Sequence, residues 1–77
     1  MVRWVWAAED WQAGRGDEQL TLGHAATKEE ALRAGVAALG AESWVQEDED
    51  GLVYGALDEG DPDGCWLGRV VLLLVEA

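Results

Sequence analysis

The 77-residue chain contains no Lys, Arg or His between residues 34 and 68. The same stretch holds nine acidic residues, so it carries a net charge of −9 out of −11 for the whole chain. Polyanions such as DNA, RNA and acidic membranes are bound through Lys and Arg, which argues against all three as direct partners. Such uneven charge also weakens a fold through self-repulsion, so its presence calls for an explanation.

Other absences narrow the class of protein. Cys65 is the single cysteine, which excludes an internal disulfide and a cysteine-based zinc site. The longest apolar run, VVLLLV at 70–75, has six residues, whereas a membrane-spanning helix needs about 20. The first residues lack the apolar core and small-residue cleavage site of a secretory signal. We therefore expect a soluble cytoplasmic protein.

The composition also carries information about source and order. Ile, Phe and Asn are missing and there is one Lys, whereas Ala, Gly, Val and Trp are plentiful. This bias towards GC-rich codons predicts an origin in a GC-rich bacterium or in a phage that infects one. Because 49% of the residues are hydrophobic, we expect one compact folded domain over residues 1–77 rather than disorder.

The first half of the chain predicts two strands and a helix. Apolar and polar residues alternate over 2–8 and again over 19–25, with a Gly-rich turn between. Thr27 and Glu30 form a capping-box pattern that starts a helix over 28–39. Gly40 stands where a C′ glycine ends a helix.

The second half predicts three strands. These cover 42–46, 52–57 and 65–76, and Asp50-Gly51 is suited to a hairpin turn between the first two. Pro62 excludes a central strand around it. The apolar run at 70–75 favours a central strand buried on both faces. The expected fold is α+β: a small antiparallel sheet, order β-β-α-β-β-β, with one helix on one face.

One helix leaves the second face of such a sheet open. That face would display the aromatic side chains that point away from the helix, and an exposed aromatic face commonly marks a contact surface. The candidates are Trp4, Trp6, Trp44 and Tyr54. The corresponding function is a structural or assembly module that forms a homodimer or docks on a larger complex; the alternative is that long side chains and loops cover the face.

The acidic turns match no complete metal or catalytic motif. Glu59, Asp61, Asp63 and Gly64 fit the first half of an EF-hand loop, but Val70 stands where its final Glu belongs. Weak Ca²⁺ binding over 58–64 stays open, and we expect no dedicated metal site or cofactor. His24 and Cys65 have no spacing typical of a catalytic pair. We therefore expect no enzymatic activity.

Two resemblances bear on function. The segment GHAATKEEALRAG resembles small DNA-contacting α+β modules such as phage integrase arm-binding domains, which implies a similar fold, but the basic residues for DNA are missing. In size, charge and compactness the chain resembles small acidic phage inhibitors, including anti-CRISPR proteins and other DNA mimics. This implies a protein that blocks a nucleic-acid-binding protein or ribonucleoprotein complex.

The acidic hairpin is the expected contact surface for such a partner. Carboxylates on strands about 4.8 Å apart approximate the charge spacing of a nucleic-acid backbone. The alternative is a solvated surface that only maintains solubility. The candidate partner-binding residues are Glu42, Glu47, Asp48, Glu49, Asp50, Asp58, Glu59, Asp61 and Asp63.

Overall fold

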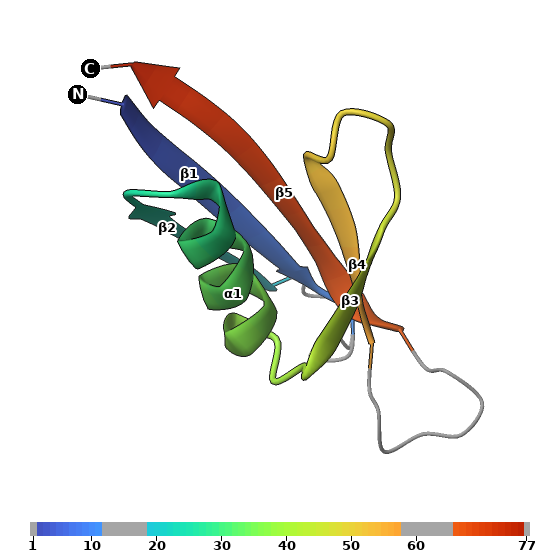
Figure 1. Cartoon of the computed structure of the whole chain (residues 1–77). Helices are drawn as coiled ribbons and strands as arrows, with labels where there is room; N and C mark the ends of the chain where they lie inside the picture. The colour runs from blue at the N-terminus through green and yellow to red at the C-terminus, as the bar shows by residue number, and fades with distance from the viewer. Residues whose placement is uncertain (1, 12–18, 58–65, 77) are drawn as a thin grey trace.

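The computed structural model describes residues 2–11, 19–57 and 66–76 (Figure 1). Five strands form one antiparallel sheet in the order β2-β1-β5-β4-β3, with a helix after β2. This confirms the predicted α+β class and element order. The elements are β1 (Val2–Asp10), β2 (Gln19–Ala25), α1 (Lys28–Ala38), β3 (Ser43–Gln46), β4 (Val53–Leu57) and β5 (Trp66–Glu76).

Both ends of α1 are fixed by local hydrogen bonds. The Thr27 side chain accepts a hydrogen bond from the backbone N–H of Glu30 at 3.2 Å. At the other end, Gly40 has a φ of +71° and its N–H donates to the carbonyl of Ala37, while Ala41 N–H donates to Val36. This is a Schellman ending, which requires the left-handed residue that Gly40 supplies. The predicted start and stop of the helix are confirmed.

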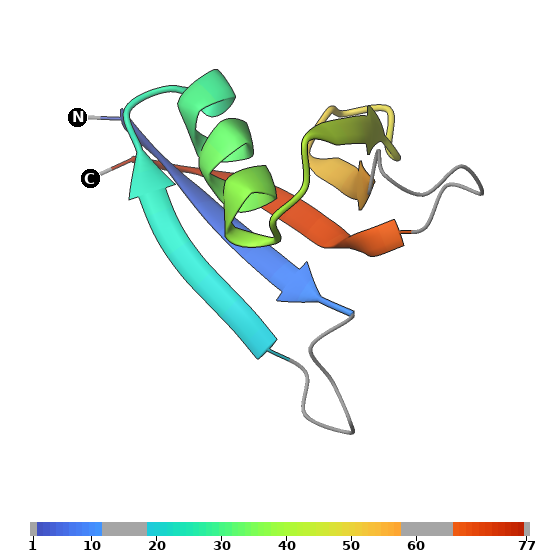
Figure 2. The same ribbon diagram turned by 90° about the horizontal axis from the view of Figure 1, so that it is seen from below.

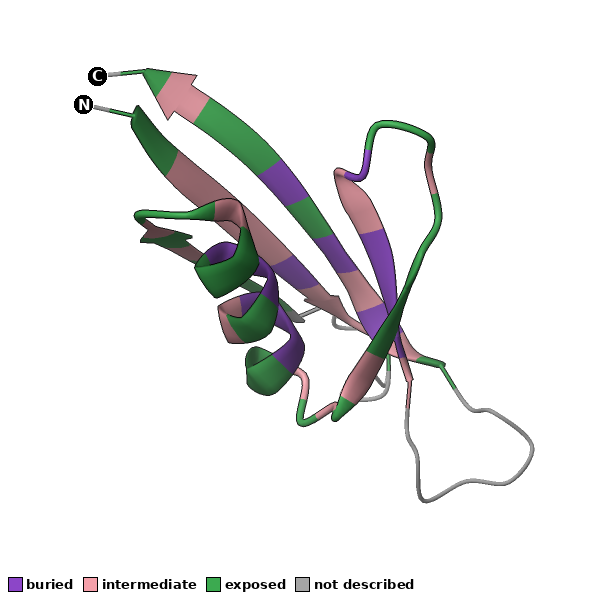
Figure 3. Cartoon of the chain, in the orientation of Figure 1, coloured by how far each residue is buried: buried purple, intermediate pink, exposed green. Residues whose placement is uncertain are grey.

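The core lies between α1 and one face of the sheet, the covered face (Figure 2). Figure 3 shows the buried residues on the side of α1 that meets the strands. Gly35 makes this approach possible, because a Cβ there would lie 2.6 Å from Cγ1 of Val70. The buried apolar residues are Ala8, Ala31, Leu32, Val36, Tyr54, Ala56, Val70 and Leu72.

Strand β5 occupies the centre of the sheet, as predicted, but the prediction that both its faces are buried is wrong. Val70 and Leu72 are buried, whereas Val71 and Leu73 are exposed. Successive side chains of a strand point to opposite faces, and α1 covers one face alone. Among the described residues no helix is long and apolar enough to cross a membrane.

Candidate functional site

The second face of the sheet, the open face, carries a continuous row of aliphatic side chains. The pairing register places Leu22 of β2 opposite Ala7 of β1, Ala7 opposite Val71 of β5, and Val71 opposite Val53 of β4. Residues paired directly across antiparallel strands point to the same face. These four residues, the aliphatic row, therefore cross the sheet over four adjacent strands.

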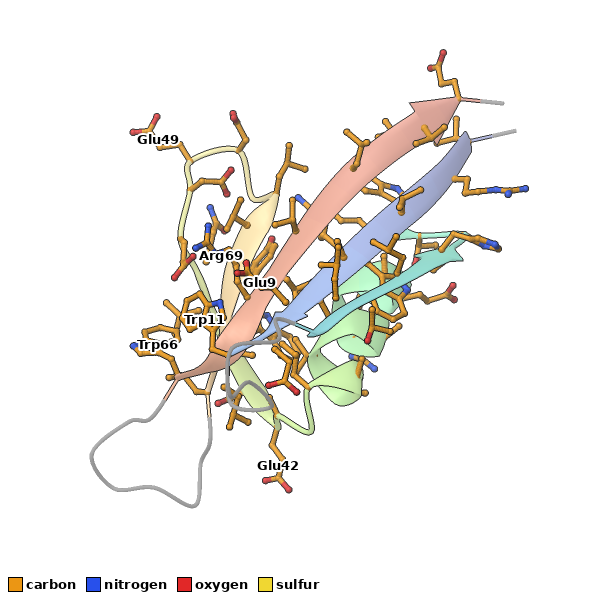
Figure 4. The ribbon with its side chains drawn as sticks, turned by 180° about the vertical axis from the view of Figure 1, so that it is seen from behind. Glu9, Trp11, Glu42, Glu49, Trp66 and Arg69 are labelled. Carbon is orange, nitrogen blue, oxygen red and sulfur yellow. The ribbon has the colours of Figure 1, made fainter. Side chains whose placement is uncertain are left out.

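Further apolar residues widen this surface on one side of the row. Val5 and Leu73 form the next register pair, and their neighbour on β2 is His24. Leu22 is 64% exposed and Leu73 is 59% exposed. No element among the described residues covers this face (Figures 2 and 4). Contiguous exposed apolar surface of this kind marks a contact site more often than scattered single residues do.

A charged and aromatic group, the Arg69 cluster, borders the row on its other side (Figure 4). Glu9 of β1 and Gly55 of β4 flank Arg69 in the register. The Arg69 guanidinium carbon lies 5.4 Å from the centre of the Trp11 ring, a cation–π distance. Its Nε atom is buried and has no hydrogen-bond partner among the described residues. The Trp66 ring lies over Gly55, where a Cβ would collide with it.

The predicted aromatic contact surface is not on the open face. Trp4 and Trp6 pack half-buried against the core on the covered face, and Tyr54 is a buried core residue. Trp44 is exposed on the edge strand β3, in register with buried Ala56. The reason is steric: glycine at position 23 leaves room for the Trp6 ring between the sheet and α1. The open face is instead mainly aliphatic, with Trp11 and Trp66 at its charged end.

The acidic turn, residues 47–50, joins β3 to β4. One of its four acids, Asp48, has a structural role. The Asp48 Oδ1 atom accepts hydrogen bonds from the backbone N–H groups of Leu52 and Val53 at 2.9 and 3.0 Å. Gly51 follows with a φ of +68°, which confirms the predicted Asp-Gly turn. Asp48 therefore holds the hairpin closed. Glu47, Glu49 and Asp50 remain exposed on the same turn.

The structure separates the other predicted acids from this turn. Glu42 is exposed just before the start of β3, and four residues at about 3.3 Å each place it roughly 13 Å from the turn. Asp58, Glu59, Asp61 and Asp63, the candidate Ca²⁺ segment 58–64 and Cys65 lie outside the described residues. Within the described ranges, no three His, Cys, Asp or Glu side chains gather closely enough to hold a metal ion.

His24 lies on the open face beside Val5, its register partner on β1. It borders a shallow hollow at the end of the β1–β2 pair, lined by Val2, Arg3, His24, Ala25 and Ala26.

Comparison of the chain with protein-family models, curated proteins and solved structures finds no match. The argument for function therefore rests on the open face and the acidic turn.

The sequence contained two signals for the open face. One was the alternation of Val5 and Ala7 with Trp4 and Trp6, in which the small residues mark the face away from the helix. The other was Arg69, a lone charge at the start of an apolar strand. Both signals need the strand register before they can be assigned to a face.

Proposed function

We propose that this protein is a non-enzymatic binding module that docks on another protein chain through its open sheet face. The aliphatic row of Leu22, Ala7, Val71 and Val53 is the observation that carries the proposal. Removing apolar surface from water is favourable by about 25 cal/mol per Å², so a matching apolar surface would be held there.

The charge distribution supports the same surface. The chain carries 16 acidic residues, yet of those within the described strands only Glu9 has its register position on the open face. Asp10 and Glu76 belong to the alternate positions. A face kept nearly free of acids in so acidic a chain avoids the desolvation cost that buried carboxylates would impose on a complex.

Site-specific cross-linking tests the proposal with neighbouring residues of one strand. Leu73 on the open face and Leu74 on the alternate side of β5 are both exposed, at 59% and 46%. A photoactivatable residue at position 73, in cells that produce the protein, is expected to form a defined adduct with another chain, and the same residue at 74 is not. Equal adducts at both positions, or none at 73, would contradict the proposal.

A second candidate function uses the acidic turn. Here the protein is a phage-type inhibitor that mimics nucleic acid and blocks a basic nucleic-acid-binding protein or ribonucleoprotein complex. The observation in its favour is that Glu47, Glu49 and Asp50 are exposed together on one tight turn. Such a turn would be attracted to a basic groove, and the attraction would fall with added salt.

Charge reversal distinguishes this second function. The double variant Glu47→Lys with Glu49→Lys keeps Asp48 and therefore the turn. Its control, Glu30→Lys with Glu76→Lys, changes net charge equally at exposed positions elsewhere. The native chain and the control are expected to release a fluorescent DNA duplex from a purified DNA-binding protein of the host at low salt, and the turn variant is not. Equal release by both variants would exclude the acidic turn as the blocking surface.

A further inference from the structure

We infer that the occupant of the open face is a second copy of this chain, packed sheet against sheet about a twofold axis that runs parallel to the strands between β1 and β5. This inference rests on the proposed docking function and names its partner. Two sheets pack face to face about 10 Å apart with their strands within about 30° of each other, which such an axis permits.

The axis places β1 of one copy over β5 of the other, and β2 over β4. Ala7 then faces Val71 of the second copy, Val5 faces Leu73, and Leu22 faces Val53, so that these three facing pairs are aliphatic. A twofold interface is self-complementary, because each such pair occurs twice. The aliphatic row meets itself, with the small Ala7 opposite the larger Val71.

The charges of the Arg69 cluster satisfy the same symmetry. Glu9 and Arg69 are register partners on either side of the axis, so Glu9 of each copy faces Arg69 of the other. Within one chain, no carboxylate of the described residues forms an ion pair with Arg69. Arg presents several N–H donors in a planar fork that suits a carboxylate. Glu9 of the second copy would supply that carboxylate, and Glu9 of the first copy would do the same for Arg69 of the second.

The extent of the face and the position of the acids agree with this arrangement. The four strands of 7, 9, 11 and 5 residues, at about 3.3 Å per residue and about 4.8 Å spacing, cover roughly 500 Å². Two such faces bury roughly 1,000 Å² in total, the size from which a specific interface begins. Strand β3 and the acidic turn lie beyond the overlap, so the like-charged turns of the two copies stand at opposite edges.

Sedimentation equilibrium of the full chain tests the occupant. The native protein is expected at about twice the 8.3 kDa chain mass. Glu9→Arg alone and Arg69→Glu alone each place like charges across the axis, and each is expected to raise the dimer dissociation constant at least about tenfold. Circular dichroism of each variant checks that the sheet is retained, and Glu9→Gln with Arg69→Gln, made separately, replace any variant that does not fold.

Mixing the two charge variants gives the decisive result. A chain with Arg at 9 and Arg at 69 complements a chain with Glu at both positions in both pairs at once. The equimolar mixture is therefore expected to recover the doubled mass that neither variant reaches alone. A mixture that stays near 8.3 kDa while the native chain dimerises would overturn this axis.

The outcomes also separate this inference from the function on which it rests. A native chain that sediments at 8.3 kDa at every concentration would exclude the second copy as occupant. If position 73 then still gives a cross-linked adduct, of a mass other than two chains, the docking function stands with a different partner. If position 73 gives no adduct, both fail together.

Discussion

The two faces of this sheet are built from alternate residues of the same strands, yet they have different environments. Leu72 on the covered face is 1% exposed, and its neighbour Leu73 on the open face is 59% exposed. Both faces are apolar, so hydrophobicity alone does not distinguish them. The difference comes from α1, which covers one face and leaves the other exposed. Comparing matched residues across the sheet therefore separates what holds the fold from what is available for binding.

The largest expected effect comes from truncating those two neighbours. Leu72→Ala leaves a cavity beneath α1 and is expected to lower the free energy of unfolding by about 2–5 kcal/mol. Leu73→Ala removes an exposed side chain and is expected to change it by no more than about 0.5 kcal/mol in dilute protein. Urea unfolding at low protein concentration measures both.

Varying the protein concentration extends the comparison of Leu72→Ala with Leu73→Ala. If the open face binds a second copy, the loss in free energy of unfolding caused by Leu73→Ala grows as protein concentration rises. The reason is that only the folded state associates, so association stabilises the folded state and not the unfolded one. The cost of Leu72→Ala is expected at every concentration. Equal costs for the two variants in dilute protein would break the distinction between the faces.

Two glycines give a second comparison, one on each face beneath a Trp ring. A Cβ at Gly23 would lie 2.4 Å from the Trp6 ring, which is held between the sheet and α1. Gly23→Ala is therefore expected to cost about 1–3 kcal/mol through overpacking. A Cβ at Gly55 would meet the ring of Trp66, which is 39% exposed and so less enclosed than Trp6. Gly55→Ala is expected to cost less than Gly23→Ala in the same unfolding measurement; the reverse order would contradict the assignment of these rings.

The smallest expected effect distinguishes a structural acid of the turn, Asp48, from an exposed one, Glu49. Asp48→Ala removes the acceptor for Leu52 and Val53 and is expected to lower the free energy of unfolding by about 1–2 kcal/mol. Asp48→Asn retains an oxygen at that place and is expected to lose less. Glu49→Ala, at an exposed position, is expected to stay within about 0.5 kcal/mol. Equal losses for Asp48→Ala and Glu49→Ala would show that the carboxylate does not hold the turn.

Local signals account for the parts of the fold that the sequence predicted. The Thr27 cap, Gly40 and the Asp50-Gly51 turn each act over a few residues, so their patterns are legible without tertiary context. The order of elements follows from these and from the alternating segments. The exposure of alternate residues in β5 was not predicted, because VVLLLV contains no polar residue that would mark one face.

The candidate site could not be predicted from the sequence, because it depends on contacts between residues that are far apart in the chain. Trp4 and Trp6 were recognised as one face of a strand, but which face α1 covers is decided by Gly23 and Gly35, which are distant in the sequence. Trp66 lies over Gly55 beside a register shift between Ala56 and Leu57, an irregularity that alternation alone does not reveal. The structural role of Asp48 likewise depends on the turn that brings its carboxylate to two backbone N–H groups.

The most direct test of the central claim, that the open face is where this chain meets a second copy, is the mass of two lysine variants. Leu73→Lys and Leu74→Lys place the same charge on adjacent exposed residues that point to opposite faces of β5. Sedimentation equilibrium is expected to give about 8.3 kDa for Leu73→Lys and about twice that mass for Leu74→Lys and the native chain. Equal masses for the two variants would contradict the claim.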